Sequence, residues 1–351
     1  MKPTFSLHER EKQIFPVEPL SDADRVCISS KELNKRIKLR WSADGRLHVT
    51  ATQHVGVLEL DCATIQVRPK LAGNELDALA MFDYASEIGK LRRLQHLRAM
   101  PGEGRNLRDL VCQLLTESCE DLLRHGLRRD YVRREEARPT VRGRMLHDRQ
   151  ILRRYGRLDR IECRFDDFDS DILDNRLCAV ALRLAARTAQ DDQVRADAAR
   201  VAEHFIAVCE PGTLTARLLT ERVVYHRGNE IYRPAHQWAL LLLRSAGFHD
   251  LYSSAGPSGR AFMFDMDVLF EAFIVRLLRE AVRDNGLTVR ANENLGGIIC
   301  FDDGTRYTDV RPDIRLVRGN GANAWYRSID AKYKHYTGRH LSTPDLYQSF
   351  S

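Results

Sequence analysis

Two acidic residues and a lysine near the C-terminus have the types and spacing of a metal-dependent hydrolytic site. Asp313 follows a proline, and Asp330 is separated from Lys332 by one residue. Two carboxylates that lie close together repel each other unless a divalent cation lies between them, and ligation by oxygen alone favours Mg²⁺ or Mn²⁺ over zinc. A lysine beside such a cation can position the attacking water or neutralise developing charge on a phosphodiester. The three residues therefore predict a site that cuts a DNA backbone.

The spacing of these residues also permits a plainer interpretation. A motif this short occurs by chance, and the alternative is a surface hairpin with ordinary charge pairs. Glu271, on a predicted helix before the strands, could extend the metal site through its carboxylate, although an exposed helix charge is the more common role. Whether Asp313 and Asp330 lie close together therefore depends on the strands and the helix that contain and surround them.

Three predicted strands must position the acidic residues, at 287–293, 307–317 and 324–334. In the second strand, period-two alternation places Ile314 and Leu316 on one face and Asp313 on the other. In the third strand, Asp330 and Lys332 share one face. Because the loop at 318–324 is suited to a hairpin, pairing of the two strands would bring Asp313 beside Asp330 and Lys332.

The remaining chain predicts a mixed α+β protein. A strand-like pattern runs from Arg25 to Leu71, and a Gly-, Pro- and Ser-rich segment at 252–260 is the best candidate linker. Apolar residues at helical spacing predict helices at about 74–90, 107–124, 175–188, 191–209 and 266–284.

Arginine is concentrated in one part of the chain. Between Asp121 and Arg164 there are 14 arginines and 7 acidic residues, a local balance of +7 against +6 for the whole chain. Arginine binds phosphate through a planar fork of donors, so this segment could contact nucleic acid or an acidic partner. A solvated helical face with Arg–Glu pairs is an equally good interpretation.

Several classes of protein are disfavoured by what the sequence lacks. It contains no apolar run of about 18 residues and no apolar signal segment, which favours a cytoplasmic protein without a membrane partner. The eight cysteines form no CxxC pair, so free thiols are expected rather than structural zinc. No GxxxxGK[ST] phosphate loop is present, so we expect no nucleotide hydrolysis by the chain alone.

Several sequence blocks together resemble a known family, the McrC subunits of McrBC-type modification-dependent restriction systems. The blocks occur in the family's order, at 54–71, 126–145, 174–184, 262–280, 311–314 and 329–334. The resemblance implies a PD-(D/E)xK endonuclease that docks on a ring of McrB-like AAA+ GTPase subunits and stimulates them. GTP would be bound by the partner, and the substrate would be DNA carrying modified cytosine.

The resemblance also implies roles for particular regions and residues. Residues 1–165 would form a partner-contacting region, β-rich and then helical, followed by a helical region at 166–255 and the nuclease domain at 256–351. Asp313 and Asp330 would bind the metal, and Lys332 would be the catalytic lysine. Contact with the partner, or with DNA, would involve Arg128, Arg129, Arg133, Arg134, Arg142 and Arg144.

The chain departs from the family pattern at its end. Family members continue through a helix opened by a motif like DLYQ, whereas this sequence ends at DLYQSFS, so that Gln348 is the only supporting residue of that helix present. The nuclease core would then be incomplete. This leaves an alternative, a non-catalytic adaptor that stimulates the GTPase ring but cannot cut.

Overall fold

The computed structural model describes most of the chain, in two compact units. Unit 1 comprises Met1–Glu103 and Met263–Ser351, and unit 2 comprises Gly104–Phe262. Within them, the described residues are 2–42, 44–70, 75–88, 106–157, 159–210, 223–245, 260–283, 285–300, 306–319 and 325–333. Helices and strands both occur in each unit, which confirms the α+β class. The three functional regions expected from the sequence stay a prediction.

The N-terminal part of unit 1 contains two small sheets. The first has the strand order β1-β6-β5-β10 and comprises Thr4–His8, Thr64–Arg68, His54–Glu59 and Ala261–Asp265 in that order. The second has the order β2-β4-β3 and comprises Lys12–Pro16, Arg46–Ala51 and Ile37–Trp41. In β6 the alternate residues Ile65 and Val67 are buried, whereas β5 is buried at four successive positions from Val55 to Leu58, as a strand covered on both faces requires.

The predicted strand pattern from Arg25 onward is wrong over its first part, and the first two strands of the chain were not predicted. Residues 22–36 form two short helices, α1 (Asp22–Ser29) and α2 (Lys31–Arg36). The Ser21 side chain accepts a hydrogen bond from the Asp24 N–H and caps α1, and acidic residues in its first turn favour the helix dipole. These capping signals outweigh the weak alternation of the segment.

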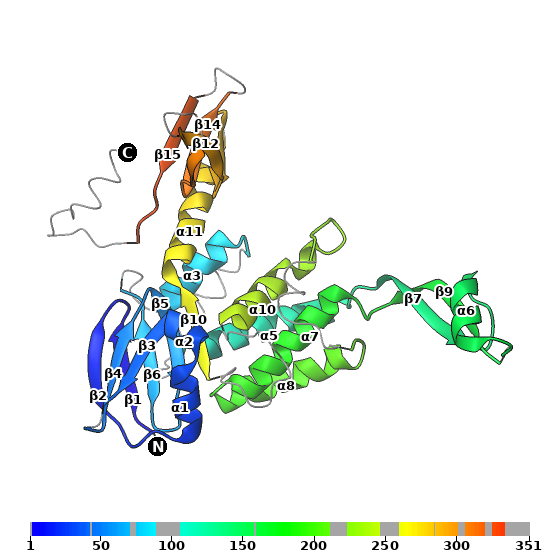
Figure 1. The fold of residues 1–351 in the computed structure, drawn as a ribbon, viewed down its shortest axis with the longest axis horizontal. Helices are drawn as coiled ribbons and strands as arrows, with labels where there is room; N and C mark the ends of the chain where they lie inside the picture. The colour runs from blue at the N-terminus through cyan, green and yellow to red at the C-terminus, as the bar shows by residue number, and fades with distance from the viewer. Residues whose placement is uncertain are drawn as a thin grey trace. The chain divides into compact units, whose positions relative to one another are not determined.

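Helix α11 (Met266–Ala281) leads from the N-terminal sheets to the C-terminal strands. Asp265 caps it by accepting hydrogen bonds from the N–H groups of Asp267 and Val268. Helix α3 (Glu75–Ala85) packs against α11 (Figure 1). Both helices confirm the predicted helical segments, while residue 74, where the first of them was predicted to begin, and the linker residues 252–259 lie outside the described residues.

The C-terminal strands form a three-stranded antiparallel sheet and a separate two-stranded ribbon. The sheet order is β11-β14-β15, with strands Leu287–Ala291, Ile314–Arg318 and Trp325–Ile329. The ribbon pairs β12 (Leu295–Cys300) with β13 (Arg306–Val310). The single strand expected at 307–317 is therefore two strands, because Pro312 has no N–H to continue a ladder, and β12 was not predicted. Ile314 is fully buried against Val275 and Val289, which joins the sheet to α11.

Unit 2 is built on packed helices. They are α5 (Leu107–His125), α7 (Leu173–Thr188), α8 (Asp192–Ile206), the short 3₁₀ helix η1 (Glu230–Tyr232) and α10 (Arg233–Ser245). The side chains of Asn106 and Asp191 cap α5 and α8, and α5 ends at Gly126, whose φ is +86°. The helices predicted at 107–124, 175–188 and 191–209 are thus confirmed. No helix in the described part of the chain is long and apolar enough to span a membrane.

A second part of unit 2, which we call the arm, comprises residues 128–170. It contains β7 (Asp130–Arg138), β8 (Arg144–Met145), α6 (His147–Arg154) and β9 (Ile161–Asp169). Strands β7 and β9 pair along their whole length, from Asp130 opposite Asp169 to Arg138 opposite Ile161 (Figure 1). The helical interpretation of the arginine-rich segment is therefore wrong for residues 130–138, which form a strand.

The cysteines are core residues wherever the structure describes their side chains. Seven of them are buried with free thiols. Burial raises the pKa of Cys112 to about 12, so this thiol stays protonated and unreactive at neutral pH. The expectation of free thiols is confirmed for these seven.

Candidate functional site

The register of the β14–β15 hairpin brings the predicted acidic residues together. Ile314 pairs with Ile329, so Asp313 and Asp330, one position beyond this pair, face each other at the end of the hairpin. Asp313 Oδ2 accepts a hydrogen bond of 2.9 Å from the Ala331 N–H. Lys332 Nζ lies 3.0 Å from Asp330 Oδ2. The sequence motif therefore corresponds to one local cluster of two carboxylates and an ammonium group.

The carboxyl group of Asp313 is in an unfavourable environment for a negative charge. Burial is the main cause that raises its pKa, followed by its contact with Asp330 and the negative charges of Asp330 and Glu271. The Ala331 N–H opposes this effect only in part. A divalent cation between the two carboxylates would relieve both the burial and the repulsion.

The donor set fits a hard divalent cation that keeps part of its water shell. Asp313 and Asp330 offer oxygen ligands, and Mg²⁺ is commonly held by one or two carboxylates with water completing its octahedron. Within the described ranges, no three or more His, Cys, Asp or Glu side chains are gathered closely enough to hold a metal ion. Of the described residues, Asp313 and Asp330 would supply the ligands.

The two residues expected to support the site have different outcomes. Glu271 is partly buried on α11, where its charge reaches Asp313, and its Oε1 accepts a hydrogen bond from Asn292 Nδ2. Gln348 lies outside the described residues. Asn292 was missed by sequence reasoning, which placed it inside the strand predicted at 287–293; its residue type is the local signal, because asparagine tolerates the left-handed conformation.

The arginines of the arm are largely matched by acidic residues of β9. Arg133 contacts Asp166 at 3.4 Å, Arg142 contacts Asp167 at 2.8 Å, and Arg134 contacts Asp169. Two more of the predicted contact residues lie nearby: Arg129 donates to the Phe168 carbonyl, while Arg144 is exposed. The positive charge of these arginines is therefore partly balanced by the acidic residues of β9. The arm as a whole is less basic than its arginine-rich first half.

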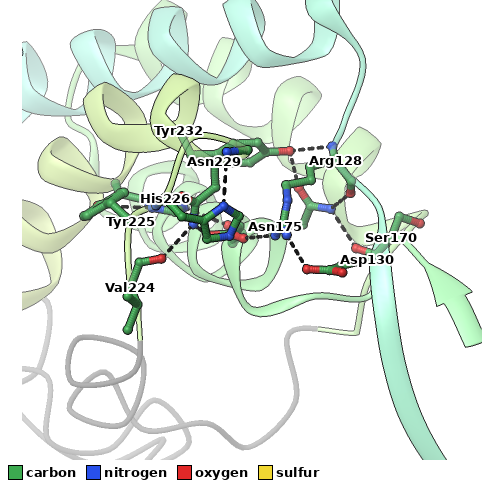
Figure 2. Close-up of polar contacts among 12 residues, drawn as sticks. Arg128, Asp130, Ser170, Asn175, Val224, Tyr225, His226, Asn229 and Tyr232 are labelled. Carbon is green, nitrogen blue, oxygen red and sulfur yellow. Dashed lines mark hydrogen bonds and ion pairs between the residues drawn. The ribbon is translucent and has the colours of Figure 1, made fainter. Parts of the chain in front are cut away.

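Arg128, the sixth predicted contact residue, belongs to a buried polar cluster where the arm joins the helices. Its guanidinium contacts Asp174 Oδ2 at 2.7 Å and also Asp130. Its backbone N–H donates to the Tyr232 hydroxyl, which donates in turn to Asn175 Oδ1 (Figure 2).

Asn175 completes the cluster by tying both ends of the arm together. Its Nδ2 donates to the carbonyls of Arg128 and Ser170 (Figure 2). Asn229 Nδ2 donates a hydrogen bond of 3.2 Å to Asp174 Oδ1, the carboxylate oxygen that Arg128 does not contact. Because each of these polar groups has a partner, the cluster is an anchor of the arm rather than a second reactive site.

The far part of the arm exposes large apolar side chains. No residue of α6 is buried, and Leu152 and Tyr155 are 84% and 85% exposed. Tyr131 is also 72% exposed, but it lies at the opposite end of the arm, where β7 begins beside the helices. Exposed apolar side chains gathered on one small element are typical of a surface that another protein covers.

Comparison with known proteins agrees with the fold and places the chain in a family. The family model described as McrBC 5-methylcytosine restriction system component matches residues 49–351, so the chain belongs to this family of restriction-system components. The resemblance to McrC is thereby confirmed. No curated protein sequence matches the chain.

Two solved chains, both from assemblies of Thermococcus gammatolerans, are similar in fold. One, from the cryo-EM structure of the McrBC complex, is 24% identical, with a TM-score of 0.52 over 78% of this chain and 87% of that chain. The other comes from a refined half-complex of a tetradecameric assembly of McrB AAA+ hexamers with bound McrC. It is 20% identical, with a TM-score of 0.57 over 99% of this chain and 84% of that chain.

Proposed function

We propose that this chain is the nuclease subunit of a modification-dependent restriction complex. It hydrolyses phosphodiester bonds of DNA with Mg²⁺ or Mn²⁺ when docked on a ring of McrB-like AAA+ GTPase subunits, whose GTP hydrolysis it stimulates. The observation that carries the catalytic part of this proposal is the meeting of Asp313, Asp330 and Lys332 at one end of the β14–β15 hairpin. The parts of the proposal that concern a restriction system and methylated cytosine are supported by the description of the family.

In this proposal each residue of the cluster has a separate role. Asp313 and Asp330 would hold the divalent cation, which when bound would lower the pKa of a water and stabilise charge on the phosphate. Lys332 contacts Asp330 and would donate a hydrogen bond from its ammonium group to the oxygen of the attacking water or to a phosphate oxygen. The Ala331 N–H fixes the orientation of Asp313 before substrate arrives.

The partner is proposed from the relatives and from the surface of the arm. One solved relative is described as McrC bound to McrB AAA+ hexamers. In this chain the far part of the arm presents Leu152 and Tyr155 to solvent, together with arginines of β7. We assign the contact with the GTPase ring to this surface, and GTP to the partner. Residence in the cytoplasm stays an expectation.

The test is cleavage of plasmid DNA containing 5-methylcytosine by the full chain together with its McrB-like partner, GTP and Mg²⁺. Lys332→Ala should reduce cleavage by at least about 100-fold, as expected for loss of one charged group that stabilises a transition state. GTP hydrolysis by the ring should remain stimulated, which shows that the variant still docks. Cleavage at the unsubstituted rate by Lys332→Ala would remove this residue from the mechanism.

A second candidate function is that of a non-catalytic adaptor that stimulates the ring. Such a role needs only a partner-binding surface, and the exposed Leu152 and Tyr155 of the arm offer one whether or not the acidic cluster cuts DNA. In the same assay, the unsubstituted chain would then stimulate GTP hydrolysis without cutting under Mg²⁺ or Mn²⁺.

A further inference from the structure

Asn292 connects two elements of the candidate site that are far apart in the sequence. It directly follows β11, and its backbone N–H donates a 2.9 Å hydrogen bond to the Asp313 carbonyl. This bond continues the β11–β14 ladder by one residue beyond the pair Ala291–Ile314. Its side-chain Nδ2 donates to Glu271 Oε1 on α11. One residue thus touches the main chain of Asp313 and the side chain of Glu271.

The backbone conformation of Asn292 directs its side chain toward the helix. Its φ is +53°, in the left-handed region that asparagine and glycine adopt more readily than other residues. The chain turns away from the sheet at this point while the N–H stays on the ladder. Asn292 itself is exposed, so burial does not explain its position.

The contact fixes the position of a third negative charge. Glu271 is held next to the site because Asn292, whose amide bonds the Glu271 carboxylate, is also bonded to the Asp313 carbonyl; Glu271 is not gathered with Asp313 and Asp330 into a three-ligand group. An amide that binds one carboxylate oxygen limits the rotamers of a glutamate, which otherwise turns toward solvent and away from like charges. The bond from Asn292 therefore keeps Glu271 beside the pair against their mutual repulsion.

We infer that Asn292 is a positioning residue of the candidate metal site, holding the Glu271 carboxylate where its charge strengthens the attraction of Asp313 and Asp330 for a divalent cation. The inference rests on the proposed function, because it assumes that the acidic pair binds such an ion. Residues that orient groups around a metal typically change its affinity by about 10- to 100-fold when they are replaced. Since Glu271 acts here through its charge alone, we expect an effect near the lower end.

The test is a Mn²⁺ titration of the full chain, followed by the electron paramagnetic resonance signal of the free ion. Asn292→Gly keeps the left-handed backbone and the N–H bond to Asp313 but removes the amide. It should weaken Mn²⁺ binding by roughly tenfold.

The link through Glu271 is tested by a double-mutant cycle. Glu271→Gln alone should weaken Mn²⁺ binding, and adding Asn292→Gly to it should cause little further loss. An equal loss from Asn292→Gly with and without Glu271→Gln would overturn the inference. So would an Asn292→Gly variant that binds Mn²⁺ as tightly as the unsubstituted chain.

A matched control is available at Glu87, which also has a positive φ of 57° and contacts α11 through Arg276 at 2.6 Å. Glu87→Gly should leave Mn²⁺ binding unchanged, and an equal loss there would show that any loosening of α11 produces the effect. Asp313→Asn separates this inference from the proposed function. If Asp313→Asn binds Mn²⁺ like the unsubstituted chain, the acidic pair is not the metal site, and the proposed function fails first.

Discussion

The arm and the β14–β15 hairpin are both short antiparallel structures rich in charge, but their charges are arranged in opposite ways. In the arm, Glu135 accepts hydrogen bonds from Arg164 at 2.6 Å, and this contact, with that from Arg149, lowers the Glu135 pKa. In the hairpin, burial and the neighbouring carboxylate of Asp330 raise the Asp313 pKa. One structure matches opposite charges, and the other gathers like charges.

This difference separates a structural role from a chemical one. Matched charges across β7 and β9 favour the folded hairpin without requiring a ligand. Carboxylates gathered at one end of a hairpin cost folding free energy, and a fold retains them where a bound cation or a substrate needs them. The arginine-rich segment is conspicuous in the sequence, but the short acidic motif carries the stronger case for catalysis.

The largest effect on stability is expected where the arm joins the helices. Arg128 and Asp174 have side chains only 18% and 8% exposed, so Arg128→Ala leaves a buried carboxylate without its main counter-charge. It should lower the free energy of unfolding by about 3 kcal/mol, measured by urea denaturation. Arg133→Ala is the control, because Arg133 and Asp166 are 69% and 55% exposed and such a pair contributes roughly 0.5 kcal/mol. Equal losses of unfolding free energy in Arg128→Ala and Arg133→Ala would contradict the view that the buried Arg128–Asp174 pair stabilises the fold more than the exposed Arg133–Asp166 pair.

A smaller effect is expected within the arm at Gly143, whose φ is +69°. A Cβ at this position would lie 2.4 Å from the Arg164 carbonyl oxygen and 2.9 Å from Phe165 Cβ. Gly143→Ala should therefore cost about 2 kcal/mol and reduce hydrogen-exchange protection in β9. Gly45→Ala is the matched control, since Gly45 has a φ of +75° but open space around its Cβ position. Similar costs at the two glycines would show that backbone strain alone accounts for the effect.

The smallest effect has the opposite sign and lies in the hairpin. Because the Asp313 pKa is raised in the folded chain, the stability linked to this group is present at low pH and is lost as pH rises through that pKa. Asp313→Asn should therefore raise the melting temperature at pH 7 in EDTA, by up to about 2 °C. The gain should disappear below pH 3, where both states of the unsubstituted chain are protonated. A lower melting temperature at pH 7 would mean that Asp313 stabilises the fold as a charged group.

The hairpin could be predicted from the sequence because its information is local. Ile314 and Ile329 alternate with polar residues, and a short loop between the strands fixes which residues face each other. The long predicted strand at 307–317 was wrong only at Pro312, where the ladder is interrupted. Correct placement of Asp313 followed from alternation over a few residues.

The features that were missed depend on residues far away in the sequence. Strand β7 has the sequence DYVRREEAR, which shows no apolar alternation, and it pairs with acidic residues of β9 about 30 positions later. The role of Asn292 depends on its hydrogen bond to Glu271, which lies 21 residues earlier in the sequence and is brought beside it by the fold. Such contacts are set by tertiary packing, which a local pattern does not record.

The most direct measurement is cleavage of plasmid DNA carrying 5-methylcytosine by the complete complex formed with Asp313→Asn, with Mg²⁺ and GTP. Arg200→Ala, at an exposed position on α8 outside the arm, serves as the control, and stimulated GTP hydrolysis serves as the measure of docking. The account predicts that Asp313→Asn docks and stimulates the ring but does not cut, although it is the more stable chain without metal. Arg200→Ala should retain cleavage. Cutting by Asp313→Asn at the unsubstituted rate would contradict the assignment of the acidic hairpin as the catalytic site.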